Sequence, residues 1–299
     1  MKPLVVSLPG EMELGEALAE RIGGDLAKTH IRSFPDDETY VRLESPIEGR
    51  DVVVASTLDR PNTKFLPLVF LAETVRELNA ASIGLAAPYL AYMRQDSCFK
   101  PGEAMTSRFF GRLLSSSFDW LVTVDPHLHR HSSLDEIYSI PSEVVQAAGP
   151  IARWISEHVD RPLLIGPDEE SQQWISAVAA AGSFPSVILE KSRHGDYDVE
   201  VSGKSAPMWS NQQPVVVDDI ISTGRTMVGA VEYLARRDLP PPICIGIHGL
   251  FVEDAFQALT DAGAAKIITC NTVPHPSNSI DINEELAAGV RAMLEGVAG

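Results

Sequence analysis

Short apolar runs alternate along the chain with segments in which apolar residues recur at helical spacing. The runs predict strands at residues 3–8, 51–56, 82–87, 120–125, 162–166, 186–191, 214–219, 243–249 and 265–271. The segments between them predict helices at residues 63–78, 104–114, 150–158, 169–180, 226–236, 253–261 and 283–295. Within 150–158, for example, Ile151, Trp154 and Ile155 fall on one face, as in an amphipathic helix.

This alternation predicts an α/β fold in which mainly parallel sheets are covered by helices on both faces. In such sheets ligands bind beyond the carboxyl ends of the strands. The residues that directly follow each predicted strand are therefore the first candidates for a functional site.

A boundary between two domains is predicted near Gly149-Pro150, because both residue types interrupt regular structure and proline suits the first turn of a following helix. We expect one domain over residues 1–148 and a second over 149–299. The halves are similar in size and pattern, which indicates an ancient duplication, although no sequence repeat is evident.

Composition narrows the classes of partner. The chain has 299 residues, 44% hydrophobic and 22% charged, with a formal net charge of −17. This acidity argues against nucleic acid and against an anionic membrane surface. The three scattered cysteines form no CxxC pair. No apolar run reaches the roughly 18 residues of a membrane helix, and the opening run is too short for a signal peptide. We therefore expect a cytoplasmic protein.

The stretch VVVDDIISTGRTM (215–227) carries the strongest local pattern. An apolar strand leads to Asp218 and Asp219, whose carboxylates suit ribose hydroxyls or a hydrated Mg²⁺. The loop that follows opens a predicted helix and consists of Ser222, Thr223, Gly224, Arg225 and Thr226. Amides and hydroxyls at a helix start form an anion pocket. The alternative is an ordinary strand–turn–helix with Ser/Thr capping.

Two further candidates lie in the first half. The turn at 33–43 holds Asp36, Asp37 and Glu38 beside Phe34, and taken alone it also fits a solvated acidic turn. Arg94 and Gln95 follow a predicted strand. The guanidinium of the arginine can donate two hydrogen bonds to phosphate oxygens, and the side-chain amide of the glutamine provides further donors.

Another strand end in the first half is TVDPHLHRH (123–131), where Asp125 and His127 lie at i and i+2 and suit a divalent ion or a phosphate. The cluster of His127, His129 and His131 raises the alternative of zinc. Neither a cysteine nor an HxxxH spacing supports it.

Strand ends of the second half add two candidates. Asp168 follows an apolar strand and a Gly-Pro turn, but the GxxxxGK[ST] pattern of a P-loop is absent. Lys191 and Arg193 follow the next predicted strand. Taken alone, these two cations fit a basic hairpin equally well.

The order of these motifs is more informative than any one of them. FxDxE, YxRQD, VDxH, PD, KxR and the Asp-Asp stretch follow one another, and the segment FKPGEAMTSRFFGRLL follows the RQD. Together they resemble the ribose-phosphate pyrophosphokinase family, especially its shorter archaeal-like branch. A phosphoribosyltransferase would match only the last motif. The resemblance implies two tandem type I phosphoribosyltransferase-like domains.

The resemblance also implies roles for the candidate residues. Phe34 is expected to stack on adenine, with Asp36, Asp37 and Glu38 at its polar edge, and Arg94 and Gln95 are expected to bind ATP. His127 and Asp168 match the family's Mg²⁺ positions, and Lys191 and Arg193 match its catalytic residues. Ribose 5-phosphate is expected at Arg193, Asp218, Asp219 and residues 222–226.

The implied reaction transfers the β,γ-diphosphate of ATP to the C1 hydroxyl of ribose 5-phosphate, with Mg²⁺ and in a homo-oligomer, as a step of nucleotide biosynthesis. Three alternative functions remain: a non-catalytic regulatory subunit, a diphosphokinase for another sugar phosphate, and a phosphoribosyltransferase. The diphosphokinase for another sugar phosphate is suggested by Ser222 and Arg225, which stand where the resembled family commonly has an aspartate and a glycine. Asp37 and Pro126 likewise replace a usual glycine and leucine.

Overall fold

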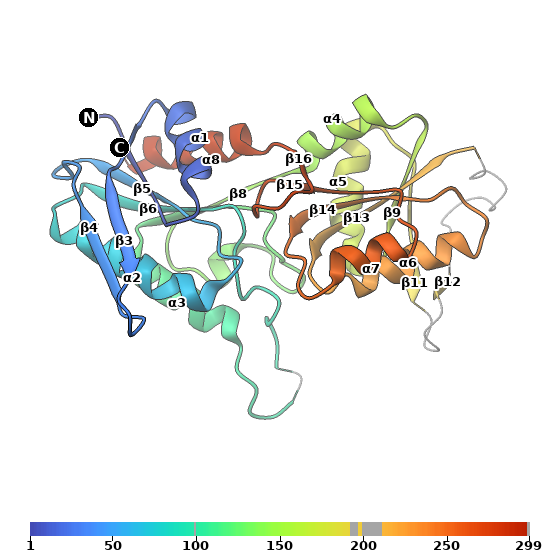
Figure 1. Cartoon of the computed structure of the whole chain (residues 1–299), viewed down its shortest axis with the longest axis horizontal. Helices are drawn as coiled ribbons and strands as arrows, with labels where there is room; N and C mark the ends of the chain where they lie inside the picture. Colours follow the sequence, from blue (N-terminus) through green and yellow to red (C-terminus); the bar gives the residue numbers. More distant parts are fainter. Residues whose placement is uncertain (99, 192–196, 199–210, 298–299) are drawn as a thin grey trace. The chain divides into compact units, whose positions relative to one another are not determined.

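The computed structural model describes residues 1–98, 100–191, 197–198 and 211–297 (Figure 1). The chain divides into two compact units. Unit 1 contains Met1–Val145 together with Asn283–Gly299, and unit 2 contains Gln146–Ile282. The last helix is thus part of unit 1, although it follows unit 2 in the sequence.

Unit 1 is built on a six-stranded parallel sheet in the order β2-β1-β5-β6-β7-β8. Its strands are β1 (Leu4–Ser7), β2 (Asp25–Leu26), β5 (Asp51–Ala55), β6 (Ser82–Ala87), β7 (Trp120–Val124) and β8 (Ser142–Val145). Residues of β6 and β7 are buried throughout, as expected for strands covered on both faces. Gly84 leaves room for Trp120, because a Cβ there would lie 2.0 Å from the indole ring.

Helices and a hairpin complete unit 1. The helices are α1 (Met12–Ile22), α2 (Pro61–Glu77), α3 (Thr106–Ser117), α8 (Asn283–Val297) and the short 3-10 turn η1 (Leu134–Glu136). The antiparallel hairpin consists of β3 (Thr29–Ser33) and β4 (Thr39–Leu43), and it forms a separate two-stranded sheet. Its residues are exposed or half-buried.

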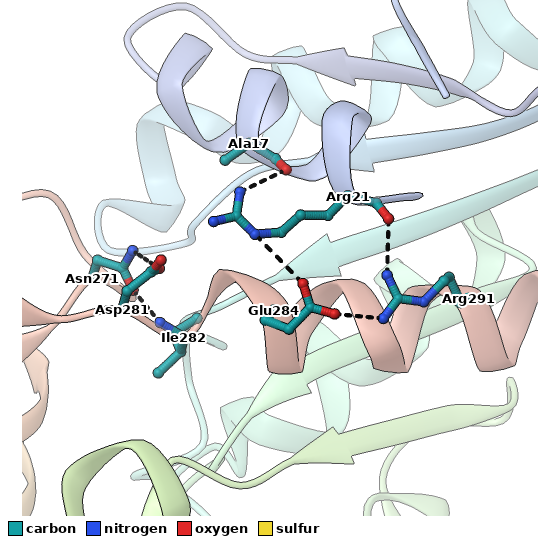
Figure 2. Close-up of polar contacts among 7 residues, drawn as sticks. All are labelled: Ala17, Arg21, Asn271, Asp281, Ile282, Glu284 and Arg291. Atoms are coloured by element: carbon teal, nitrogen blue, oxygen red, sulfur yellow. Dashed lines mark hydrogen bonds and ion pairs between the residues drawn. The ribbon is translucent and has the colours of Figure 1, made fainter. Parts of the chain in front are cut away.

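Helix α8 packs along α1, and a network of arginines joins them (Figure 2). Glu284 pairs with Arg21 at 3.8 Å and with Arg291 at 2.8 Å. Arg291 also donates a hydrogen bond to the backbone carbonyl of Arg21 at 2.9 Å. On its other side α8 approaches the sheet closely, since a Cβ on Gly289 would lie 2.8 Å from Val145.

Unit 2 repeats the same topology with a six-stranded parallel sheet in the order β10-β9-β13-β14-β15-β16. Its strands are β9 (Pro162–Gly166), β10 (Ser186–Ile188), β13 (Gln213–Ile221), β14 (Ile243–Gly249), β15 (Lys266–Cys270) and β16 (Asn278–Ile280). Its helices are α4 (Ala148–His158), α5 (Gln172–Gly182), α6 (Arg225–Ala235), α7 (Ala255–Asp261) and the 3-10 turn η2 (Glu169–Ser171).

The end of unit 2 is fixed just before the chain enters α8. Asn271 follows β15 and donates a side-chain hydrogen bond to Asp281 at 2.8 Å, while its own Oδ1 accepts one from the amide of Ile282 at 2.9 Å (Figure 2). A second antiparallel pair, β11 (Glu190–Lys191) with β12 (Tyr197–Asp198), lies outside the main sheet.

The α/β class with parallel sheets is confirmed, and every predicted strand and helix except the strand at 186–191 is present, most of them with shifted ends. One prediction needs correction: residues 186–191 are not a single strand, because β10 joins the main sheet while β11 pairs with β12. The pattern did not reveal α1, the β3–β4 hairpin, β2, β8 or β16. Most of these are too short or too exposed to show a clear period. No described helix is long and apolar enough to cross a membrane.

Candidate functional site

Strand β13 carries two adjacent aspartates beyond the point where β9 stops pairing with it. Pairing with β9 ends at Val216, whereas pairing with β14 continues to Ile221. Asp219 is buried, with 4% of its surface exposed, and Asp218 is half-buried. Burial raises the pKa of Asp218 well above its usual range, and the negative charges of Asp219 and Asp168 raise it further.

Asp168 lies at the same edge of the sheet, after β9. Its side chain caps η2 by accepting a hydrogen bond from the amide of Ser171 at 3.2 Å. Burial raises the pKa of Asp168, and the charges of Glu170 and Asp219 add to the rise, although the Ser171 amide opposes it. Gly166 permits the tight turn, because a Cβ there would lie 2.4 Å from the Ser171 hydroxyl.

These carboxylates repel one another, and the charges that shift the pKa values of Asp168 and Asp218 come from other acidic groups. Such a cluster is stabilised by a divalent cation or by hydroxyl donors. Carboxylate oxygens at the end of a parallel sheet suit Mg²⁺, so the donor set fits this ion. The same oxygens can accept hydrogen bonds from a ribose.

The loop after β13 leads directly into α6. Gly224 has a φ of 71°, a left-handed conformation that favours glycine. Helix α6 begins at Arg225, and among the described residues no side chain caps it. The first amides of the helix and its dipole therefore favour a bound anion.

Side chains of this loop extend the anion site. Thr223 and Arg225 are exposed, whereas Ser222 and Thr226 are half-buried. The amide of Val252, in the β14–α7 connection, donates a hydrogen bond to the carbonyl of Ser222 at 3.1 Å. The β14–α7 connection thus holds the loop, while the exposed hydroxyl of Thr223 and the exposed guanidinium of Arg225 can contact a phosphate.

In unit 1, the β3–β4 turn presents the acidic residues. The amide of Phe34 donates to the carbonyl of Glu38 at 2.7 Å, and the amide of Asp37 donates to the carbonyl of Phe34 at 3.0 Å. Asp37 has a φ of 67°. Aspartate tolerates this left-handed conformation. Asp36, Asp37 and Glu38 are all exposed.

An aromatic and cationic surface lies beside this turn. The guanidinium of Arg32 is 4.6 Å from the ring centroid of Phe34 and 4.8 Å from that of Tyr40. Phe34 remains 39% exposed. An exposed ring with an arginine against it offers a stacking surface for a flat, electron-rich ligand.

Arg94 and Gln95 lie exposed in the loop after β6. The loop is anchored on both sides. Thr106 donates a hydrogen bond to the side-chain oxygen of Gln95 at 2.9 Å. The buried carboxylate of Asp96 accepts a hydrogen bond from Arg130 at 2.7 Å. The sequence pattern missed Arg130, since nothing local indicates that the loop after β7 reaches the loop after β6.

His127 and its neighbours follow β7. The rings of His127 and His129 meet edge-on, with centroids 3.9 Å apart. His131 lies 2.8 Å from a carboxylate oxygen of Glu136. Among the described residues, no group of metal-ligating side chains contains all three histidines.

Comparison with known proteins identifies the family. The model of the N-terminal domain of ribose phosphate pyrophosphokinase matches residues 4–117, and that of the phosphoribosyl transferase domain matches residues 133–284. The chain is 31% identical to the ribose-phosphate pyrophosphokinase of Methanopyrus kandleri, with 96% of this chain and 98% of the relative aligned. It is 32% identical to that of Sulfolobus acidocaldarius, over 92% and 95%. The chain belongs to the ribose-phosphate pyrophosphokinase family.

A solved structure supports the fold. The phosphoribosylpyrophosphate synthetase of Mycobacterium smegmatis superimposes with a TM-score of 0.86 at 24% identity, covering 99% of this chain and 100% of that one. The expected family, its α/β fold with two domains, and the enzyme class are therefore confirmed.

Some residues expected from the ribose-phosphate pyrophosphokinase pattern belong to different units or lie outside the described residues. His127 belongs to unit 1 and Asp168 to unit 2, and each is placed within its own unit. Lys191 lies in β11, paired with Tyr197 across the hairpin. Arg193 lies outside the described residues.

Proposed function

We propose that the chain transfers the β,γ-diphosphate of ATP to the C1 hydroxyl of ribose 5-phosphate, giving phosphoribosyl pyrophosphate and AMP for nucleotide biosynthesis. The observation that carries this proposal is the carboxyl edge of unit 2. An acidic pair in β13 stands directly before a loop that opens α6 at a left-handed glycine. This arrangement suits a ribose on one side and a phosphate on the other.

In this proposal the loop 222–226 binds the 5-phosphate, and Asp218 and Asp219 accept hydrogen bonds from the ribose hydroxyls. Arg225 is exposed beside the helix start and adds a cation that the common glycine lacks. Asp218 and Asp219 thereby orient the sugar so that its C1 hydroxyl meets the diphosphate. Fixing two reactants in this way supplies a large part of the rate in phosphoryl transfer.

ATP is assigned to unit 1. Phe34, backed by Arg32, stacks on the adenine, and Asp36, Asp37 and Glu38 accept hydrogen bonds from its amino edge. Arg94 and Gln95 bind the phosphates or ribose of ATP from a loop that Asp96 and Arg130 anchor.

Mg²⁺ is assigned to His127 and Asp168, the two positions that match the family's metal sites. When bound, the ion neutralises charge on the transferred diphosphate. The raised pKa of Asp168 beside other carboxylates supports a cation there. We assign Lys191 and Arg193 to stabilising the negative charge that develops on the diphosphate between the attacking and leaving oxygens. We also assign Arg193 to binding the phosphate of ribose 5-phosphate. We assign the enzyme to the cytoplasm, where ATP is abundant, and expect a homo-oligomer.

The test is release of AMP that depends on ribose 5-phosphate, with purified chain, ATP and Mg²⁺. Lys191→Ala should lose most of the rate at unchanged thermal stability, and Lys266→Ala, a change at an exposed lysine of β15, should retain it. Nucleotide binding without any AMP release would instead favour the regulatory subunit. Phosphoribosyl pyrophosphate consumed with a free base would favour the phosphoribosyltransferase.

A second candidate, a diphosphokinase for a different sugar phosphate, is favoured by Ser222 and Arg225 in the phosphate loop. A panel of pentose and hexose phosphates decides between them. Activity on ribose 5-phosphate alone removes the second candidate, and a better kcat/KM with another sugar phosphate replaces the first.

A further inference from the structure

The phosphate loop, residues 222–226, is held by the β14–α7 connection, residues 250–254. The amides of Leu250 and Phe251 both donate hydrogen bonds to the last carbonyl of β13, each at 3.0 Å. The amide of Val252 donates to the first carbonyl of the loop at 3.1 Å. Three successive amides therefore fix the point at which the chain leaves β13, so the position of the loop depends on the shape of this connection.

Two residues of the connection have a backbone conformation that side chains disfavour. Phe251 has a φ of 41° and Glu253 has a φ of 58°. A left-handed φ is uncommon for residues other than glycine, and it is least expected for a bulky side chain. Such a conformation persists only where the surrounding structure fixes it, and it is frequent where a chain binds a ligand. The contacts that fix Phe251 therefore also determine where the phosphate loop lies.

The ring of Phe251 packs against two other rings and against its own strand. Its centroid lies 4.3 Å from that of His275, at an interplanar angle of 33°, and 5.3 Å from that of Phe256, edge-on. Gly249 at the end of β14 lets the ring fold back, because a Cβ there would lie 2.6 Å from it. Aromatic pairs at such separations attract one another beyond the area that they bury. These contacts hold the connection in its left-handed form.

His275 lies in the β15–β16 connection and is itself held by hydrogen bonds. Its Nδ1 accepts a hydrogen bond from the amide of Ser277 at 3.1 Å and lies 2.8 Å from the hydroxyl of the same residue. That hydroxyl is 2.8 Å from the buried hydroxyl of Thr269 in β15. Because an amide N–H can only donate, Nδ1 is unprotonated and the imidazole is neutral. Burial lowers the pKa of His275, which favours the same neutral form.

We propose that Phe251 and His275 are positioning residues for the sugar phosphate. Their stacked rings hold the β14–α7 connection, and this connection holds the phosphate loop in the shape that binds the phosphate. The inference rests on the proposed function of the loop. Since both residues act through the loop, their loss should weaken the affinity for the sugar phosphate and leave the chemical step nearly unchanged.

The first test measures binding of ribose 5-phosphate by calorimetry to the native chain, Phe251→Leu and His275→Ala. Each substitution should weaken binding about tenfold or more, because the connection loses the ring contact that fixes it. Phe184→Leu is the matched control. This half-buried ring of unit 2 also lies over a glycine, Gly182, but it precedes β10 at the amino end of the sheet, away from the loop. It should leave binding unchanged.

A conservative variant keeps the test independent of folding. His275→Asn retains an acceptor for the amide of Ser277 but lacks the ring, so it should weaken binding as much as His275→Ala does while remaining folded by circular dichroism. Native-like binding by His275→Asn would show that the ring contact has no role in positioning the loop, and it would overturn the proposal.

The double variant Phe251→Leu/His275→Ala separates a shared role from two independent ones. If the two rings act through one contact, the double variant should bind no more than about twofold more weakly than the weaker of the single variants. Losses that multiply would overturn the proposal. Native-like binding in either single variant, or an equal loss in Phe184→Leu, would do the same.

Steady-state kinetics distinguishes positioning from a loss of folded protein. Phe251→Leu should raise the KM for ribose 5-phosphate about tenfold or more, with kcat nearly unchanged and the KM for ATP unaltered. A variant that was only less folded would lose kcat at an unchanged KM, and this result would count against positioning.

The same experiments keep the inference and the proposed function apart. If the native chain binds ribose 5-phosphate but releases no AMP, the proposed function fails, while the binding series still decides on Phe251 and His275. If the native chain turns over and the variants bind and react as it does, the inference alone fails. A native chain that does not bind ribose 5-phosphate overturns both.

Discussion

The two units have the same strand order, yet the carboxyl edges of their sheets are built differently. In unit 1, Glu11 follows β1 and Asp59 follows β5, and both pair with Lys64 of α2. In unit 2, Asp168 follows β9 and Asp218 lies at the end of β13, which are the matching strands. There the charges that act on both carboxyls are negative.

This difference separates an edge whose carboxylates pair with a lysine of the same unit from one that is ready for a ligand. Lys64 also donates a hydrogen bond to the carbonyl of Thr57 at 2.8 Å, so its ammonium is well coordinated by the protein itself. Unit 1 therefore supplies a cation to its edge from its own helix α2, and its proposed ATP residues lie on a hairpin and a loop instead. Unit 2 leaves the balance to a cation or a substrate from solution.

The largest effect is expected at the unit 2 edge. Asp218→Asn removes an acceptor for the sugar and should lower kcat/KM by about 10²–10³-fold, the range seen when one preorganised polar group is lost. The same change relieves repulsion with Asp219 and Asp168, so Tm should stay equal or rise. Kinetic assays and calorimetry measure both quantities. Full activity of Asp218→Asn would contradict the proposal that the unit 2 edge, unlike the unit 1 edge, binds a substrate.

At the unit 1 edge we expect a loss of stability instead. Lys64→Met leaves Glu11, which is 4% exposed, and Asp59 without their cation. The free energy of unfolding should fall by about 3 kcal/mol, as when one partner of a buried pair is removed. Urea unfolding measures this, with Lys28→Met as the control at an exposed lysine of the same unit. Adding Glu11→Gln should recover part of the loss.

A smaller, selective effect is expected at the anchored loop of unit 1. Arg130→Met removes the ion pair with Asp96 and should raise the KM for ATP about tenfold, equivalent to ~1.4 kcal/mol. The KM for ribose 5-phosphate should hardly change, since that substrate is assigned to unit 2. Steady-state kinetics with each substrate varied distinguishes the two. An equal rise in both constants would contradict the division of substrates between the units.

The smallest effect is a pH dependence from Glu11, whose pKa is raised by burial even though Lys64 opposes the rise. Because the folded state binds this proton more tightly than the unfolded state, the group's contribution to stability is complete below the ordinary pKa of 4.5 and declines as pH rises through the raised pKa. The stability of the native chain relative to Glu11→Gln should therefore fall over that range. Urea unfolding of both proteins across pH 4–7 checks the sign.

Local pattern predicted the edge of unit 2 well, because Asp218, Asp219 and the loop that opens α6 are consecutive in the sequence. Asp168 could also be predicted, since matching positions after parallel strands converge at one edge. The cluster in unit 1 could not, because Glu11 and Lys64 are 53 positions apart and only the packing of α2 joins them. Asp96 and Arg130 are similarly separated by 34 positions. The packing of α8 on α1 depends on contacts that the spacing of apolar residues within either helix does not indicate.

The return of α8 to unit 1 sets an order for folding during synthesis. Unit 2 is continuous from Gln146 to Ile282, so all its strands are present before α8 is made. Unit 1 gains Glu284 and Arg291, the partners of Arg21, only when the chain is nearly finished. We therefore predict that chains stopped after Ile282 hold a folded unit 2 beside an incomplete unit 1, because domains fold as units when their contacts become available. Limited proteolysis of such chains would show protection of unit 2 alone, and equal protection of both units would contradict this order.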